Sequence, residues 1–295
     1  MSTTSSEEWT IGRLLTWTAD YLKKQGADSP RLDAEVLLAH ARGCKRLDLY
    51  TAFGDMADDS LRTAFRELVR RRAQGTPVAY LVGHREFYSL SFQVTPAVLI
   101  PRPETEFVVI EALDRLKQGS ATDPRVVDVG TGSGAIAVSI AKHAPQAQVT
   151  AVDVSESALE VAGRNVAAHG LAERVELVLG DLLSSLPPDR KFEMIVSNPP
   201  YVTEAEYGSL AKDVKDYEPR LALVGGPEGT EIIERLVQQA AERLEVGGWL
   251  IMEISPMIVD KVKAIVERES RLQFSGVTKD LAGFPRVVIA QRVAT

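Results

Sequence analysis

A tetrapeptide that could act on an amine or amide lies in the second half of the chain, at Asn198-Pro199-Pro200-Tyr201. It follows a short apolar run, Phe192 to Val196, which is typical of a buried strand. The Asn198 carboxamide offers an acceptor, and the Pro199 carbonyl offers another without a competing N–H. Acceptors beside the ring of Tyr201 suit a flat, neutral group with an NH2, such as a carboxamide or the exocyclic amine of a base. The tetrapeptide alone is equally consistent with a simple turn, because Asn-Pro and Pro-Pro commonly end strands.

A glycine-rich loop follows an earlier predicted strand. Its sequence is Asp128-Val129-Gly130-Thr131-Gly132-Ser133-Gly134, and a helix is expected directly after it. The glycines let the backbone turn sharply and approach a ligand closely. Their spacing differs from that of dinucleotide-binding and phosphate-binding loops. A glycine loop preceded by an acid suits a ligand with a cationic amine and no phosphate.

Two further strand ends carry acids. Asp153 ends the next predicted strand, where a carboxylate can accept hydrogen bonds from both hydroxyls of a ribose. Gly180-Asp181-Leu182 follows the third strand, where Asp181 could accept from an adenine amine while Leu182 lies against the ring. Each signal is weak alone, since acids cap helices and Gly-Asp marks many turns. Three successive strand ends that each suit one part of an adenosine with a charged tail predict one binding site.

Such a site requires a sheet that brings the carboxyl ends of parallel strands together. From Arg125 onward, strands alternate with helices, which favours an α/β fold with a mostly parallel sheet and helices on both faces. Ligands of such sheets bind at the carboxyl ends of the strands. The predicted strands are 126–129, 149–152, 175–178, 192–196, 249–254 and 287–290, and the predicted helices between them are 135–143, 157–169, 230–244 and 257–269.

The beginning of the chain has a different pattern. Residues from Thr10 to about Gln74 show apolar positions three and four apart, which indicates successive helices. We therefore expect a small all-α bundle domain at 1–75, a β-hairpin linker at 76–100 and the α/β domain at 101–295.

The α/β domain opens on a charged segment, Ile100-Pro101-Arg102-Pro103-Glu104-Thr105-Glu106. Its two prolines favour an extended backbone before a helix that should span 105–116. Arg102 and Glu104 either border the active site or only hold this segment against the domain.

Composition excludes several classes of protein. The 295 residues carry a net charge of −7, so no overall field attracts nucleic acid or an anionic membrane. The single cysteine, Cys44, cannot form an intrachain disulfide, and the polar amino terminus lacks a signal-peptide pattern. No apolar run is long enough to span a bilayer, and no set of histidines and cysteines suggests a metal. We expect a cytoplasmic protein without a metal.

The three strand-end motifs together resemble the S-adenosylmethionine-dependent methyltransferase superfamily with a Rossmann-like sheet, and Asn198 to Tyr201 resembles its amino-methylating members. This resemblance implies that the mostly parallel sheet has seven strands. The resemblance extends over nearly the whole chain, to the protein-glutamine N5-methyltransferases that modify peptide-chain release factors. It rests on Ser29 to Glu35, Ala79 to Leu81, Arg85 to Phe87, Leu99 to Glu106, Ala222 to Pro227 and Lys279 to Gly283. One segment departs from the family pattern, because Ile254-Ser255-Pro256-Met257 stands where the family often has a Gly-Gln-containing loop.

The resemblance implies that the protein methylates the side-chain nitrogen of the glutamine in the Gly-Gly-Gln motif of release factors. Asn198 and the Pro199 carbonyl would hold and aim that amide, with Tyr201 packed on its plane. The helical domain would recognise the release factor, and the protein is expected to act as a monomer without binding nucleic acid or membrane. The implied cofactor-binding residues are Asp128, Gly130, Thr131, Gly132, Ser133, Gly134, Asp153, Asp181, Leu182 and Asn198, and the implied substrate-binding residues are Arg102, Glu104, Asn198, Pro199, Pro200 and Tyr201.

Two other functions are consistent with the same residues. A DNA or RNA base amino-methyltransferase would use the same acceptors on a flipped base. The acidic α/β domain and the lack of a basic segment interleaved with aromatic residues disfavour it. The third interpretation is a non-catalytic module that binds the cofactor, which the intact tetrapeptide disfavours.

Overall fold

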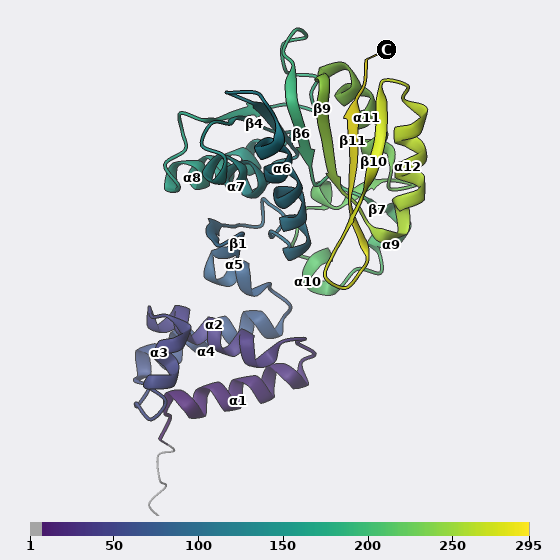
Figure 1. Ribbon diagram of the computed structural model, residues 1–295. Coiled ribbons are helices and arrows are strands. Elements are labelled where there is room, and N and C mark those ends of the chain that lie inside the picture. Colours follow the sequence, from purple (N-terminus) through teal and green to yellow (C-terminus); the bar gives the residue numbers. More distant parts are fainter. Residues whose placement is uncertain (1–7, 295) are drawn as a thin grey trace, which may run out of the picture. The chain divides into compact units, whose positions relative to one another are not determined.

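The computed structural model describes residues 8–294, which form two compact units (Figure 1). One unit contains the chain up to Gly83 together with Lys212–Tyr217, and the other contains His84–Ala211 and the chain from Glu218 onward. Each unit has its own buried core. Across residues 8–294, none of the helices combines the length and the apolar character needed to cross a membrane.

The first unit is helical. Its apolar core contains Leu15, Leu22, Leu37 and Leu38, all of them fully buried. Gly43 ends the second helix at φ 68°, in the left-handed region that favours glycine. The helices between residues 8 and 83 are α1 (Ile11–Lys24), α2 (Pro30–Arg42), α3 (Arg46–Thr51), α4 (Asp59–Ala73) and α5 (Val78–Val82).

A short segment from the second half of the chain completes this helical unit. It contains α10 (Lys212–Lys215). The guanidinium of Arg72 lies 2.8 Å from the carboxylate of Asp33 and 3.9 Å from that of Asp213. The Tyr217 hydroxyl donates to the backbone carbonyl of Gln74 at 3.3 Å. The hydrophobic periodicity of the sequence contains no sign of this return of the chain.

The second unit is built on a mostly parallel sheet of seven strands within residues 84–294, in the order β10-β11-β9-β6-β3-β4-β5. Only β11 runs antiparallel to its neighbours, β9 and β10. The predicted fold class is thus confirmed. The strands are β3 (Arg125–Val129), β4 (Gln148–Asp153), β5 (Val175–Leu179), β6 (Phe192–Ser197), β9 (Leu244–Glu253), β10 (Leu272–Lys279) and β11 (Pro285–Arg292). The residue range of β10 was not predicted, because a register shift between Phe274 and Gly276 interrupts its alternation of apolar and polar residues.

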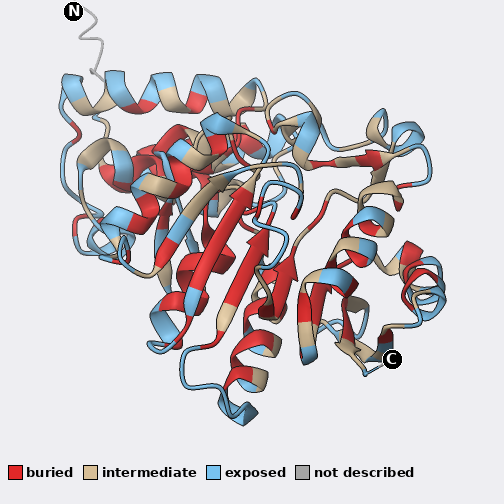
Figure 2. Cartoon of the chain, turned by 90° about the horizontal axis from the view of Figure 1, so that it is seen from above, coloured by how far each residue is buried: buried red, intermediate tan, exposed pale blue. Residues whose placement is uncertain are grey.

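Helices cover both faces of the sheet, as predicted. One core contains residues of α6 (Glu106–Gln118), α7 (Ala135–His143) and α8 (Glu156–Ala168), and the other contains residues of α11 (Glu231–Arg243) and α12 (Val259–Arg268). Adjacent residues of a strand point to opposite faces, so Val126 lies in the first core and Val127 in the second. Figure 2 shows the sheet strands as largely buried.

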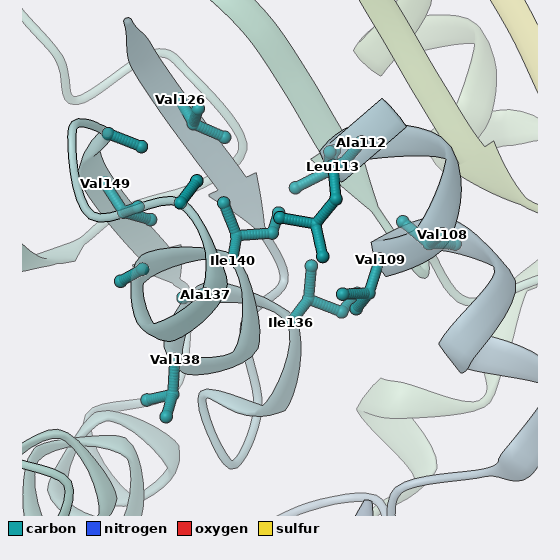
Figure 3. Packing of buried hydrophobic residues seen from close by; sticks show 14 of the residues in the cluster. Val108, Val109, Ala112, Leu113, Val126, Ile136, Ala137, Val138, Ile140 and Val149 are labelled. Atoms are coloured by element: carbon teal, nitrogen blue, oxygen red, sulfur yellow. The ribbon is translucent and has the colours of Figure 1, made fainter. Parts of the chain in front are cut away.

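The first core joins two helices to the sheet. Val109 and Leu113 of α6 point toward Ile136 and Ile140 of α7, and Val126 of β3 belongs to the same core (Figure 3). All five side chains are buried. This packing fixes α7 directly behind the glycine-rich loop from which it emerges.

The stretch 76–100, where a hairpin was expected, contains β1 (His84–Phe87) paired with β2 (Leu90–Gln93), and also the short helix α5 before them. Phe87 and Phe92 are buried in the first core. The side chain of Asn165 accepts from the N–H of Gln93 and donates to its carbonyl, at 2.7 and 3.0 Å. The hairpin is therefore anchored to α8.

The order of the strands places the ligand site. From β3 the chain moves outward to β4 and β5, then returns to the other side of β3 with β6. The chain leaves β3 into α7, which packs in the first core, whereas after β6 it continues to α11, which packs in the second. The two connections therefore run to opposite faces of the sheet, which opens a crevice between the strand ends. The glycine-rich loop follows β3 and the Asn198 tetrapeptide follows β6, so both lie at this crevice.

Candidate active site

A cavity of about 400 Å³ lies at the carboxyl ends of β3, β4 and β6. This volume is in the range of small-molecule sites. Of the residues proposed from the sequence, the cavity is lined by Arg102, Gly130, Thr131, Gly132, Ser133, Asp153, Asp181, Leu182, Asn198 and Pro200. The other proposed residues, Asp128, Gly134, Pro199, Tyr201 and Glu104, are not among its lining residues.

The glycine-rich loop forms the floor of the cavity. Gly130 and Gly132 have φ values of 74° and 56°, which an L side chain rarely adopts. A Cβ at either position would meet no protein atom within 4 Å. Glycine therefore allows the positive φ that the backbone adopts at these two positions. It also leaves the space beside the backbone open at the cavity wall. Gly134 packs instead against Ala162 of α8, where an added Cβ would lie 3.4 Å from the alanine Cβ.

Asp128 supports this loop from below. Its carboxylate is fully buried and accepts from the Thr131 hydroxyl at 2.6 Å and from the Ala137 N–H at 3.1 Å, both through Oδ2. No group within residues 8–294 donates to Oδ1. Burial raises the pKa of Asp128 to about 7, against the lowering effect of the two hydrogen bonds.

The buried Asp128 carboxyl predicts a pH-dependent stability. Because its folded pKa lies above the unfolded value, protonation favours the folded state, and this contribution is lost as pH rises through about 7. In Asp128→Asn the carboxamide oxygen can still accept from Thr131, and nothing titrates. Relative to the native protein, the free energy of unfolding of the variant should rise by about 2 kcal/mol between pH 5.5 and pH 8. Urea unfolding of the ligand-free native protein and of Asp128→Asn measures both free energies of unfolding. If the difference between the two does not change with pH, the prediction is wrong.

Asp153, at the end of β4, lines the cavity directly beside the glycine-rich loop. Its Oδ2 accepts from the Gly132 N–H at 2.8 Å and its Oδ1 from the Ser155 N–H at 2.9 Å. Ser155, not Asp153, caps α8, because its hydroxyl accepts from the Ala158 N–H. Burial raises the pKa of Asp153. Each carboxylate oxygen keeps a further lone pair for a hydroxyl in the cavity.

The loop after β5 supplies a third wall. The Asp181 carboxylate pairs with the guanidinium of Arg235 on α11, and both residues line the cavity. Leu182 has a φ of 53°, which is uncommon for a residue with a side chain. Non-glycine residues are held in that region at a cost of about 1–3 kcal/mol, and such residues cluster at ligand sites. Leu182 also lines the cavity, so the uncommon backbone conformation occurs at a residue of the candidate site.

Asn198 lies at the carboxyl end of β6 and faces the cavity. Its Nδ2 donates to the Thr105 hydroxyl at 3.1 Å. None of the described residues donates to its Oδ1. Ser197, the preceding residue, is held by a 2.7 Å hydrogen bond from its hydroxyl to the carbonyl of Val129. This bond ties the end of β6 to β3, and within residues 8–294 the amide oxygen of Asn198 has no donor and can accept a hydrogen bond.

Tyr201 contacts a buried carboxylate that our sequence analysis did not assign to the site. Its hydroxyl donates to Glu253 Oε1 at 3.3 Å, and the Thr105 hydroxyl donates to Oε2 at 2.5 Å. Glu253 is 1% exposed, and burial raises its pKa to about 7. Tyr201 packs against the second core. A glutamate that ends an otherwise apolar strand was the signal available in the sequence.

Arg102 is tied to a second carboxylate that the sequence did not reveal. Its guanidinium pairs with Glu218 Oε1 at 2.5 Å, and Glu218 Oε2 accepts from the Ile100 N–H at 3.2 Å. Glu218 is buried, while Arg102 still borders the cavity. The pair joins the segment around residue 101 to the loop that continues through Leu221 and Ala222, and both segments line the cavity. Glu104 lies close enough to Glu253 to raise its pKa.

The backbone of the tetrapeptide is supported by a glycine loop. Strand β7 (Val202–Thr203) pairs with β8 (Val224–Gly226). A Cβ added to Gly225 would lie 2.4 Å from the Pro200 carbonyl oxygen, and one added to Gly229 would lie 2.5 Å from the Tyr201 carbonyl oxygen. Glycine is required at both positions because the two backbones lie in contact.

Gly225→Ala is therefore expected to displace the tetrapeptide. The methyl group cannot be accommodated against two backbone carbonyls without a shift of Pro200. A shift of about 1 Å at Asn198 would lower the catalytic rate about 10²-fold. Gly208→Ala is the control, since its added Cβ meets only the Ala205 carbonyl oxygen, at 3.8 Å. The steady-state turnover of Gly225→Ala and of Gly208→Ala is measured under the same conditions. Equal turnover in the two variants would contradict the prediction.

The amino-acid sequence matches two known family models and is similar to known proteins over nearly its whole length. Residues 13–83 match the family model described as PrmC N-terminal domain, and residues 108–214 match the Methyltransferase small domain. The chain is 52% identical to the release factor glutamine methyltransferase of Rhodopirellula baltica, over 98% of this chain and 99% of that protein. The chain belongs to the release factor glutamine methyltransferase family. The protein of that name from Koribacter versatilis is 43% identical over 92% of this chain and 95% of its own.

Solved structures of more distant methyltransferases share the fold. The catalytic domain of hMettl16 in complex with MAT2A 3'UTR hairpin 6 aligns with a TM-score of 0.56 and 16% identity, over 82% of this chain and 86% of that chain. The T. thermophilus 16S rRNA N2 G1207 methyltransferase (RsmC) in complex with AdoMet and guanosine aligns with a TM-score of 0.52 and 20% identity, over 71% of this chain and 49% of that one. At these identities the likeness concerns the fold alone. The family resemblance that we inferred from motifs is confirmed by the closer relatives.

Proposed function

We propose that this protein transfers a methyl group from S-adenosylmethionine to the side-chain nitrogen of the glutamine in the Gly-Gly-Gln motif of peptide-chain release factors. The observation that carries the proposal is the placement of Asn198. Asn198 lines a cavity whose other walls suit an adenosine with a cationic tail, and no group within residues 8–294 donates to its amide oxygen. Membership of the release factor glutamine methyltransferase family supports the same substrate.

The residues of the cavity fit this cofactor. Asp153 retains lone pairs for the ribose hydroxyls, and Leu182 offers an apolar surface for the adenine ring. Gly130 and Gly132 leave open space where a Cβ would otherwise project. The buried Asp128 carboxylate, to whose Oδ1 no group within residues 8–294 donates, adds negative charge on the side of the cationic tail when it is ionised.

We assign the binding of the acceptor amide to the tetrapeptide. A glutamine nitrogen is a poor nucleophile because its lone pair is delocalised into the carbonyl. The Asn198 oxygen and the Pro199 carbonyl each accept one N–H, which orients the nitrogen and favours its pyramidal geometry. The cofactor, when bound, supplies a methyl group on a positively charged sulfur. The product nitrogen is far more acidic than the original amide, so its proton is released to solvent without a dedicated base.

Tyr201 acts differently from our first expectation in this proposal. Its hydroxyl is engaged with Glu253, and its ring lies outside the cavity lining. We therefore assign Tyr201 to the support of the tetrapeptide. Arg102 and Glu104 are assigned to the rim, where Arg102 pairs with Glu218.

The division of labour between the two units is also part of the proposal. The helical domain, placed at 1–75 by the sequence, recognises the body of the release factor, and the domain at 101–295 holds the cofactor and the glutamine. The hairpin within 76–100 connects them. We further propose that the protein acts in the cytoplasm as a monomer, without direct contacts to nucleic acid.

Methyl transfer from radiolabelled S-adenosylmethionine tests the function. Three acceptors are compared: a purified release factor, the same factor with the glutamine of its Gly-Gly-Gln motif replaced, and bulk DNA or RNA. Label on the unmodified factor alone is the expected result. Label on nucleic acid would instead identify a base amino-methyltransferase, and the absence of any label would favour a module that only binds the cofactor.

A further inference from the structure

Behind Asn198 lies a chain of hydrogen bonds that ends on a buried charge. Asn198 Nδ2 donates to the Thr105 hydroxyl at 3.1 Å, and that hydroxyl donates to Glu253 Oε2 at 2.5 Å. Thr105 is 5% exposed and Glu253 is 1% exposed. The three residues come from three parts of the fold: Asn198 directly follows β6, Thr105 directly precedes α6, and Glu253 ends β9.

The ionised carboxylate dictates the direction of every hydrogen bond in this chain. A carboxylate can only accept, so the single hydroxyl proton of Thr105 must point at Glu253. The Thr105 oxygen is then left with lone pairs only, and it can be approached only by a donor. Of the two ends of the Asn198 carboxamide, only the NH2 is a donor. The carboxamide oxygen must therefore turn the other way.

Among the described residues, the Thr105 hydroxyl has no hydrogen-bond partner other than Glu253 and Asn198. It stands at the position before the first turn of α6, where threonine side chains commonly cap a helix. Here its side chain makes no capping bond. Its hydroxyl is instead committed to Glu253 and Asn198.

We propose that Glu253 fixes the orientation of the Asn198 carboxamide through the Thr105 hydroxyl, so that Asn198 presents its oxygen and not its NH2 to the acceptor amide. The inference rests on the proposed function, because only an acceptor that carries N–H groups needs this orientation. Glu253 and Thr105 are positioning residues, since neither is assigned a contact with the reacting atoms. The Tyr201 hydroxyl, which also donates to Glu253, holds the other carboxylate oxygen.

Protonation of Glu253 removes this constraint. A neutral carboxyl can donate its own proton to Thr105, which frees the hydroxyl proton to point at the Asn198 oxygen. The amide can then turn over and present NH2. The groups that act on Glu253 are Thr105 and Tyr201 by hydrogen bonds, Glu104 by repulsion, and Arg286, itself paired with Asp280, by attraction. Because burial dominates and raises the pKa of Glu253 to about 7, the switch falls near neutral pH.

Thr105→Val and Thr105→Ser test the inference as a matched pair. Valine has the shape of threonine without the hydroxyl, whereas serine keeps the hydroxyl and loses a methyl group. We expect kcat for methyl transfer to fall about 10- to 100-fold in Thr105→Val, with the Kd of S-adenosylmethionine changed less than about 3-fold. Thr105→Ser should recover most of that loss. Equal losses in both variants would overturn the inference, because they would assign Thr105 to packing.

The pH profile gives a second readout. In the native protein kcat should fall as pH drops below about 7, where Glu253 becomes protonated. In Thr105→Val this fall of kcat below about pH 7 should be absent, because no hydroxyl connects Glu253 to Asn198. Asp128 titrates in the same range but does not act through Thr105, so any limb due to Asp128 persists in the variant. A profile that is unchanged by Thr105→Val would overturn the inference.

A measurement without substrate separates this inference from the proposed function. The side-chain NH2 signals of Asn198, identified by their loss in Asn198→Ala, can be followed by ¹H–¹⁵N NMR of the native protein. They should shift between pH 6 and pH 8 in the native protein, and this shift should disappear in Thr105→Val. If the signals do not respond to pH in the native protein, the inference is wrong, whatever the acceptor of the methyl group proves to be. If the native protein methylates no release factor while the signals respond, only the proposed function fails.

Discussion

Replacing Asn198 with alanine is expected to lower kcat for methyl transfer about 10²- to 10³-fold, the loss that follows removal of one well-placed hydrogen-bonding group from an active site. The acceptor amide would lose the partner that holds one of its N–H groups and aims its nitrogen. The fold should survive, because the Asn198 side chain makes a single hydrogen bond to the part of the chain that the structure describes, the one to Thr105. Single-turnover transfer of a radiolabelled methyl group measures the rate.

Cofactor binding is the control for this variant. Calorimetric titration with S-adenosylmethionine should still give a measurable Kd, since the ribose and adenine contacts are assigned to Asp153 and Leu182. Native-like transfer by Asn198→Ala would remove Asn198 from the catalytic machinery. Loss of both binding and transfer would assign it to the cofactor instead.

Asp153→Ala should weaken the binding of S-adenosylmethionine and leave the rate of methyl transfer at saturating cofactor largely unchanged, the reverse of Asn198→Ala. The carboxylate accepts from the N–H groups of Gly132 and Ser155, and we assign its remaining lone pairs to the ribose. A hydrogen bond to a charged group contributes about 1.5–3 kcal/mol, so the Kd of S-adenosylmethionine should rise about 10- to 100-fold. Transfer at saturating cofactor should be affected much less.

Asp153→Asn is the matched variant, because it keeps one acceptor oxygen and the shape of the side chain. We expect its Kd to lie between those of the native protein and the alanine variant. An unchanged Kd in Asp153→Ala would exclude Asp153 from the ribose site. Thermal unfolding of both variants shows whether the loop at Gly132 keeps its conformation without the carboxylate.

The strands β3 to β6 could be predicted because each is a short apolar run bounded by turns, whereas β9 begins at Leu244, five residues before its predicted start at 249, and β10 was not predicted. β3, β4, β5 and β6 all appear within one or two residues of their predicted limits. The cavity could also be predicted, since glycines and acids at successive strand ends meet at one edge of such a sheet. The apolar runs and the glycines and acids that follow them are each contained within a few consecutive residues, so they can be recognised from the sequence.

The supporting residues could not be predicted because their partners are distant in sequence. Glu253 is joined to Thr105, 148 positions earlier, and Glu218 to Arg102, 116 positions earlier. An isolated buried glutamate has no periodic signature. The sequence does contain the anomaly of an acid at the end of the apolar strand β9, but only the structure shows which side chains it orders.

The return of Lys212–Tyr217 to the helical unit bears on how this protein can be dissected. Removing the chain up to Gly83 would leave the carboxylate of Asp213 and the hydroxyl of Tyr217 without Arg72 and Gln74. Residue 218, immediately afterwards, is the glutamate that holds Arg102. A chimera that exchanges the amino-terminal helices with those of a relative should therefore exchange residues 212–217 as well, so that both parts of the unit descend from the same parent.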